Sequence, residues 1–287
     1  MKPVQFEYVR AGSIAEAAAL LAGSGEGAKL LAGGQSLGPV MNLRLARPTR
    51  LIDLKRAAGM RDLEADGRIA LIGAGWTHAE IEDGVVADPT RGLMRHVARG
   101  IAYRAVRNRG TLGGSLAHAD PAADWLSTMA ALDATIVAHG PDGRMARYAA
   151  DGFARGAFAT RLGEDEVLAA VEVPVLSLGA RWGYHKICRK TGEFAKAIGL
   201  AVLDPAHGVS RVLAGAVDGP PVLLPRTAAR LLEAGATAAV AMVGEEVAKG
   251  LPHLDAPARA LHVVAVRRAL VGLEGDSGGP LWSAAPC

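Results

Sequence analysis

Two glycine-rich segments hold the residues of this chain that are best suited to bind a ligand. The first reads Ala32-Gly33-Gly34-Gln35-Ser36-Leu37 and the second reads Arg109-Gly110-Thr111-Leu112-Gly113-Gly114-Ser115. Closely spaced glycines let backbone N–H groups approach an anion, and the hydroxyl and amide side chains that follow can add hydrogen bonds. Each segment is expected to open a helix, whose amino end favours negative charge. Two such loops together suit the two phosphates of one dinucleotide.

A tight strand-to-helix turn would be the better explanation of Gly33-Gly34 if that segment stood alone. The second segment favours an anion site, because ordinary surface turns seldom gather so many polar groups around their glycines. These polar residues are Arg107, Asn108, Arg109 and Thr111. The two segments together therefore predict a phosphate-binding site.

Composition excludes several classes of protein. The chain has 287 residues, of which 50% are hydrophobic, and a formal net charge of +3. This length and apolar content suffice for two or three structural units. A small positive charge from scattered arginines favours neither nucleic acid nor an anionic membrane as a partner.

The positions of the cysteines and the lengths of the apolar runs indicate in which cellular compartment the protein works. Cys188 and Cys287 are the only cysteines in the sequence. Their distant positions predict a reducing environment and argue against a zinc site or an iron–sulfur cluster within this chain. The amino-terminal segment lacks the apolar core of a signal peptide, and no apolar run is long enough to cross a bilayer. We therefore expect a cytoplasmic protein with no membrane span.

The order of apolar runs and turn residues predicts an α+β fold in three parts. Residues 1–55 read as a small α/β subdomain with a parallel sheet, and residues 56–174 as an antiparallel-rich α+β subdomain. After a linker, residues 180–287 are expected to form three antiparallel strands followed by three helices. The expected elements of this last part are Arg181 to Arg189, Ala197 to Leu203, Val209 to Val217, Arg226 to Ala234, Ala238 to Lys249 and Ala258 to Leu273.

Three segments identify a family. They are LLAGGQSLGPVMNLRLARP (Leu30 to Pro48), AVRNRGTLGGSLAHADPAADW (Ala105 to Trp125) and KICRKTGEFAKA (Lys186 to Ala197). Together they resemble the FAD-binding medium subunit of molybdenum hydroxylases, a family that includes aerobic carbon monoxide dehydrogenase and the flavin domain of xanthine dehydrogenase. The likeness spans nearly the whole chain. It implies a two-subdomain, vanillyl-alcohol-oxidase-like FAD-binding fold followed by a carboxyl-terminal flavoprotein domain.

The resemblance also implies contacts with FAD. Around the first pyrophosphate loop these are Lys29, Leu30, Leu31, Ala32, Gly33, Gly34, Gln35, Ser36 and Leu37, and in the second loop Thr111, Leu112, Gly113, Gly114 and Ser115. Asp124 matches an acidic nucleotide contact, and Leu168 and Lys186 match positions near the isoalloxazine ring. Ile101 stands where some relatives carry an aromatic residue, and Phe194 takes the place of a tyrosine over one ring face.

Simpler interpretations of some of these residues stay open. From residue type alone, Asp124 equally suits a helix cap, and Lys186 equally suits a solvated position on a strand. His118 and Asp120 form a pair that suggests a metal ligand set, but two ligands do not make a site. We expect no bound metal in this chain.

The resemblance implies an electron-transfer subunit with no catalytic acid or base of its own. A small partner subunit would supply electrons from two [2Fe-2S] clusters, and a large partner would bind molybdopterin and oxidise the substrate. The complex is expected to be a dimer of heterotrimers that reduces an external acceptor such as a quinone, NAD or oxygen. A stand-alone FAD-dependent oxidase is the alternative.

A remote alternative is a serine hydrolase. The segment Gly275-Asp276-Ser277-Gly278-Gly279-Pro280-Leu281 matches the motif that carries the nucleophile of chymotrypsin-like proteases, here Ser277. The context argues against this activity, because that fold is all-β and disulfide-bonded, whereas helices are expected before Ser277. A glycine-rich tail is the simpler interpretation.

Overall fold

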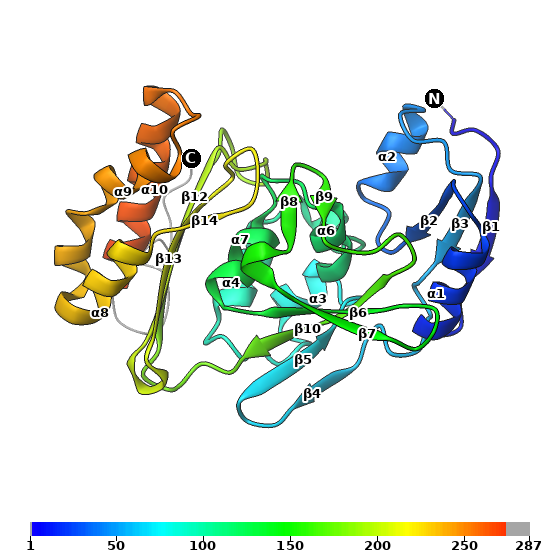
Figure 1. Cartoon of the computed structure of the whole chain (residues 1–287), viewed down its shortest axis with the longest axis horizontal. Coiled ribbons are helices and arrows are strands. Elements are labelled where there is room, and N and C mark those ends of the chain that lie inside the picture. Colours follow the sequence, from blue (N-terminus) through cyan, green and yellow to red (C-terminus); the bar gives the residue numbers. More distant parts are fainter. Residues whose placement is uncertain (1, 274–287) are drawn as a thin grey trace.

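Three sheets follow one another along the long axis of the molecule (Figure 1). The structure is a computed structural model, and it describes residues 2–273. A parallel sheet lies at one end, an antiparallel sheet lies in the middle, and a second antiparallel sheet with its helices lies at the other end. The predicted α+β class is therefore confirmed. No helix within residues 2–273 is long and apolar enough to cross a bilayer.

The first sheet has the strand order β1-β3-β2, and both of its strand pairs are parallel, as predicted. Parallel strands end at the same edge of a sheet, so the first glycine loop, which follows β2, begins at the edge where β1 and β3 also end. Its elements are β1 (Glu7–Arg10), α1 (Ile14–Gly23), β2 (Ala28–Leu31), α2 (Leu37–Asn42) and β3 (Arg50–Asp53).

Side chains cap the amino ends of α1 and α3. At α1 the hydroxyl of Ser13 accepts the N–H of Glu16, while the carboxylate of Glu16 accepts the N–H of Gly12, the residue before the N-cap. At α3 the hydroxyl of Thr77 and the carboxylate of Glu80 form the complete reciprocal box. These caps orient the helices that follow the sheet edges.

The middle sheet has the order β4-β5-β10-β6-β7, and every pair is antiparallel. Its strands are β4 (Leu63–Ala65), β5 (Ile69–Gly73), β6 (Thr135–His139), β7 (Met145–Ala149) and β10 (Val167–Pro174). The accompanying elements are α3 (His78–Asp83), α4 (Leu93–Gly100), α5 (Arg104–Arg107), α6 (Leu112–His118), α7 (Asp124–Ala131), the short helix η1 (Ala150–Gly152) and the hairpin of β8 (Ala154–Gly156) and β9 (Ala159–Thr160).

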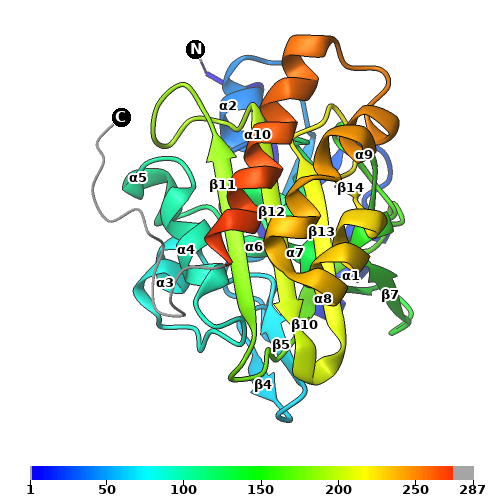
Figure 2. The same ribbon diagram turned by 90° about the vertical axis from the view of Figure 1, so that its left-hand side faces the viewer.

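The last sheet has four antiparallel strands, not the three expected, because a two-residue edge strand, β14, pairs with β13. Three helices cover one face of this sheet (Figure 2). The helix expected over Arg226 to Ala234 lies within α8, which continues past Gly235 with non-helical backbone at that glycine (φ 80°, ψ 178°). The helix expected over Ala238 to Lys249 is divided between the end of α8 and α9. The elements are β11 (Arg181–Ile187), β12 (Ala197–Asp204), η2 (Pro205–His207), β13 (Val209–Gly215), β14 (Val222–Leu223), α8 (Pro225–Val240), α9 (Val243–Gly250) and α10 (Ala256–Gly272).

Helix α7 joins the middle and last parts of the chain. All of its residues are buried, and so are all residues of β12, whose two faces pack against α7 and α10. Leu200 and Val202 belong to the core shared with α7, whereas Ala201 and Leu203 belong to the core under the helices α8 to α10. This alternation follows from the two-residue period of a strand. The shared core fixes the carboxyl-terminal sheet against α7.

Helix α10 lies directly on the backbone of β11 and β12. A Cβ atom added to Gly183 would lie 1.8 Å from the carbonyl oxygen of Ala269, and one added to Gly199 would lie 2.2 Å from that of Ala265. Neither distance is possible for real atoms, so both glycines are required for the close approach of the helix.

We expect Gly183→Ala to lower the free energy of unfolding by about 1–3 kcal/mol, the usual cost of overpacking a core. Gly179→Ala is the matched control, because a Cβ atom there would meet nothing within 4 Å. Urea unfolding of both variants beside the wild type measures the difference. Equal midpoints for the two variants would show that α10 does not approach the strand as closely as described.

Candidate cofactor-binding site

A cavity of about 660 Å³ opens between the first sheet, the helices of the middle part and the segment that follows β11. Cofactor pockets commonly have volumes of this order. Every residue for which the sequence predicts a contact lines this cavity, with the exception of Leu112. The side chain of Leu112 is fully buried in the hydrophobic core. The lining residues that were predicted are Lys29, Leu30, Leu31, Ala32, Gly33, Gly34, Gln35, Ser36, Leu37, Ile101, Thr111, Gly113, Gly114, Ser115, Asp124, Leu168 and Lys186.

The first loop presents a run of hydrogen-bond donors to this cavity. Within the described part of the chain, the backbone N–H groups of residues 33–36 have no hydrogen-bond partner. Gly34 has a φ of +69°, a left-handed conformation that favours glycine. The side-chain amide of Gln35 folds back and donates to the carbonyl oxygen of Gly33 at 3.4 Å. Consecutive free N–H groups of this kind form a cradle for an anion.

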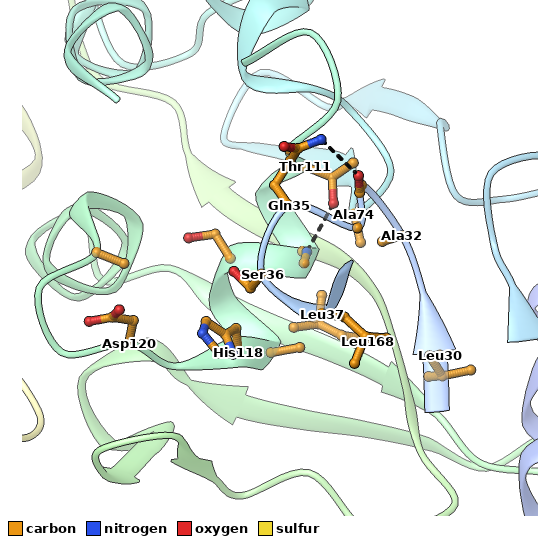
Figure 3. A pocket seen from close by; sticks show the side chains of 18 of the residues that line it. Leu30, Ala32, Gln35, Ser36, Leu37, Ala74, Thr111, His118, Asp120 and Leu168 are labelled. Carbon is orange, nitrogen blue, oxygen red and sulfur yellow. Dashed lines mark hydrogen bonds between the residues drawn. The ribbon is translucent and has the colours of Figure 1, made fainter. Parts of the chain in front are cut away.

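The second loop uses its backbone donors differently. The N–H of Leu112 donates to the carbonyl of Trp76 at 3.0 Å and that of Gly113 to the carbonyl of Ala74 at 2.9 Å. The N–H of Gly114 donates to the hydroxyl of Thr111 at 3.1 Å (Figure 3). These donors, which the sequence suggested for a phosphate, already have protein partners. They tie the start of α6 to the segment after β5.

The two loops touch each other. A Cβ atom added to Gly33 would lie 2.1 Å from the carbonyl oxygen of Arg109 and 2.8 Å from the Cα atom of Gly110. The absence of a side chain at Gly33 therefore allows the loops to meet. The prediction that both loops face one site is correct in its geometry, although Gly33 serves the contact between them.

Asp124 and Lys186 form a buried ion pair across two parts of the fold. The Nζ atom of Lys186 lies 3.0 Å from each carboxylate oxygen of Asp124, and the two side chains are 10% and 6% exposed. Nζ also lies 3.4 Å from the carbonyl oxygen of Gly100. Asp124 makes no capping bond to α7. Both simpler interpretations, a helix cap for Asp124 and a solvated Lys186, are therefore wrong.

The remaining walls are mixed in character. In Figure 3, Leu30, Leu37 and Leu168 lie together on one side of the cavity, and His118 and Asp120 lie on the other. Phe194 and Glu193 line the cavity from the segment after β11, and Phe194 is 67% exposed. A flat, partly apolar molecule with a polar edge would match these walls.

Sequence reasoning missed three polar residues of this region, namely Tyr184, Glu166 and His78. The hydroxyl of Tyr184 donates to Asp124, and the buried carboxylate of Glu166 accepts from Tyr148 at 2.7 Å. Tyr184 lies two residues before Lys186 on the same face of β11, and this spacing was the available signal. Nothing in the local sequence marks Glu166 or His78 as buried.

His78 is a neutral histidine under the second loop. Burial first, and then the charge of Arg107, lowers the pKa of His78 to about 4. Its Nδ1 atom accepts the indole N–H of Trp125 at 3.1 Å. An indole nitrogen can only donate, so the proton of the neutral ring is on Nε2. His78 thus supports the loop as an uncharged group.

Comparison with known proteins identifies the family of the chain. Residues 4–176 match the family described as the FAD binding domain in molybdopterin dehydrogenase. The chain belongs to this family. It is 39% identical over 232 residues to the carbon monoxide dehydrogenase medium chain of Hydrogenophaga pseudoflava, a match that covers 80% of each chain. It is 38% identical over 206 residues to the nicotine 6-hydroxylase medium subunit of Paenarthrobacter nicotinovorans, covering 72% of this chain and 71% of the relative.

Solved structures of the family share the fold. Carbon monoxide dehydrogenase of Hydrogenophaga pseudoflava, crystallised without the Mo-pyranopterin moiety of its cofactor, matches with a TM-score of 0.86 and 34% identity over 95% of this chain and 98% of that chain. Quinoline 2-oxidoreductase of Pseudomonas putida 86 matches with a TM-score of 0.83 and 30% identity over 95% of this chain and 98% of that chain. The similarity therefore includes the carboxyl-terminal sheet. The serine motif around Ser277 lies outside the described residues.

We expect Gly33→Ala to lower the amount of FAD that stays bound, because the added methyl group must separate the two loops. Gly38→Ala is the control, since a Cβ atom at this position of α2 meets nothing within 4 Å. The FAD-to-protein ratio of the protein purified with its partner subunits, taken from the visible spectrum, is the measurement. Full FAD content in Gly33→Ala would contradict the loop contact.

His78 makes the folded protein sensitive to acid. Between pH 6.5 and pH 4 the unfolded chain binds a proton at this histidine that the folded chain excludes, so stability falls as pH falls through that window. A depression of this size corresponds to about 3 kcal/mol. We expect His78→Gln to be less stable at pH 7 but to lose less stability on acidification. Urea unfolding at several pH values measures this, and the exposed His253→Gln should keep the wild-type slope.

Proposed function

We propose that this chain is the FAD-carrying electron-transfer subunit of a molybdenum hydroxylase built from several subunits. Its family supports this, because the relatives named above include medium chains of multi-subunit dehydrogenases and hydroxylases. The observation that carries the proposal is the single cavity in which the four free N–H groups of residues 33–36 and the buried pair of Asp124 and Lys186 both take part.

The residues of the cavity fit FAD. The diphosphate requires several donors in a small volume, and the first loop offers them next to the hydroxyls of Ser36 and Ser115. The flavin ring requires an apolar wall and a cation near its polar edge. Ile101, Phe194 and Lys186 supply these at the end of the cavity formed with β11 and the segment that follows it.

The protein residues bind, orient and tune the cofactor. Bound FAD supplies a ring that takes up electrons singly or in pairs. The amides of residues 33–36 would hold the diphosphate, and the contact of Gly33 with Arg109 fixes this cradle against the second loop. Lys186 stabilises negative charge near the ring, and Asp124 fixes the position of its Nζ atom. No acid or base of this chain takes part in the oxidation of substrate.

The partners follow from the same proposal. A small subunit with two [2Fe-2S] clusters would donate electrons to this chain, and a large molybdopterin subunit would oxidise the substrate. The chain would pass the electrons to an external acceptor such as a quinone, NAD or oxygen. We propose a dimer of heterotrimers in the cytoplasm.

Purification from the native host tests this assignment. We expect the chain to be recovered with two companion polypeptides and to show flavin absorption together with iron–sulfur absorption. Mass spectrometry identifies the companions, and extraction of the flavin identifies FAD. A colourless protein would contradict cofactor binding, and full turnover of the isolated chain with oxygen would instead indicate a stand-alone oxidase.

A further inference from the structure

Three side chains, those of Tyr184, Asp124 and Lys186, form a partly buried hydrogen-bonded chain where α7 meets β11. We infer that Tyr184 is a positioning residue that sets the charge offered to the flavin by Lys186 and Asp124, and thereby the midpoint potential of the bound FAD. This inference rests on the proposed function, since it concerns the ring end of the same cavity. Tyr184 itself does not line the cavity; it acts through Asp124.

The geometry links the three groups through one carboxylate. Asp124 accepts from the hydroxyl of Tyr184 through Oδ1, and the Nζ atom of Lys186 lies 3.0 Å from both Oδ1 and Oδ2. Tyr184 and Lys186 project from the same face of β11, whereas Asp124 lies in the first turn of α7. The shared core of these elements holds the arrangement in place.

The phenol of Tyr184 remains a neutral donor at any pH at which the protein works. Burial first, and then the adjacent carboxylate of Asp124, raises the pKa of Tyr184 well above its ordinary value of 10.0. A neutral donor draws part of the negative charge of a carboxylate toward itself. In a buried site this effect is stronger than in water.

Tyr184 therefore changes the balance between two opposite charges. The carboxylate of Asp124 opposes the field of Lys186 in the cavity, and a hydrogen bond from Tyr184 weakens that opposition. The cationic character of Lys186 then dominates toward the ring. A positive field stabilises the negative charge that a flavin gains on reduction, so it raises the midpoint potential.

The surroundings of Tyr184 allow a clean test. The ring of His96 packs against Tyr184 with centroids 5.7 Å apart and against Trp182 at 5.2 Å, so aromatic packing holds residue 184 in place. Burial lowers the pKa of His96, which keeps this neighbour uncharged. Replacement by phenylalanine keeps the ring contacts and removes only the hydroxyl.

The experiment measures the midpoint potential of the flavin in the intact complex by redox titration of its visible absorption. We expect Tyr184→Phe to shift the potential to a more negative value and Asp124→Asn to shift it to a more positive value. Tyr8→Phe is the matched control, because the hydroxyl of Tyr8 also donates to a carboxylate, that of Asp53, but neither residue lines the cavity. This control should keep the wild-type potential.

Different results of this titration would contradict the role of Tyr184 and the proposed function of the chain. An unchanged or more positive potential in Tyr184→Phe with normal FAD content would overturn the role of Tyr184, while a wild-type complex without flavin would overturn the proposed function itself. The double variant gives an independent check, because the hydroxyl has no charged acceptor left to act on once Asp124 is asparagine. The midpoint potential of the double variant should equal that of Asp124→Asn alone. If Tyr184→Phe by itself loses FAD, this comparison shows whether Tyr184 acts through Asp124, and unequal potentials would overturn the inference.

Discussion

The structure of the binding site depends on the contact between the two glycine loops. One loop ends a strand of the parallel sheet, and the other opens a helix of the middle part, so nothing in the local chain brings them together. They meet because Gly33 has no side chain where the carbonyl oxygen of Arg109 passes. This backbone contact brings both loops to one cavity, which residues 33–36 line with N–H groups that have no protein partner.

The two loops differ in whether their backbone N–H groups have partners within the protein. In the second loop the N–H groups of Leu112 and Gly113 donate to the segment after β5, and that of Gly114 donates to Thr111, so contacts within the protein hold this loop. The first loop leaves its donors without protein partners, which costs stability in the free chain unless water solvates them. A bound diphosphate would satisfy these donors, so the ligand would stabilise the folded state by mass action. The second loop is thus held by contacts within the protein, whereas the first loop keeps its N–H groups free for a ligand.

Helix α7 provides the second constraint. It is buried on all sides because it lies between the middle part and the carboxyl-terminal sheet, and its first residue is Asp124. The same packing places Lys186 of β11 against that residue. A buried ion pair contributes little net stability, because desolvation offsets the attraction of its charges. Its value here is to fix a cation at the wall of the cavity, in a chain whose family is described by its FAD binding domain.

Much of this arrangement followed from the sequence by itself, because its signals are local. The spacing of glycines marked both loops, and the order of apolar runs and turn residues indicated the parallel sheet. Tertiary structure alone decided which donors of each loop stay free and that Lys186 pairs with Asp124. It also decided that Glu166 and His78 are buried, and Tyr184 partly buried, near the cavity. The physical reason is that burial and pairing depend on partners from distant segments, which only the folded chain brings within a few ångströms. Turns, by contrast, depend only on residues next to one another in the sequence.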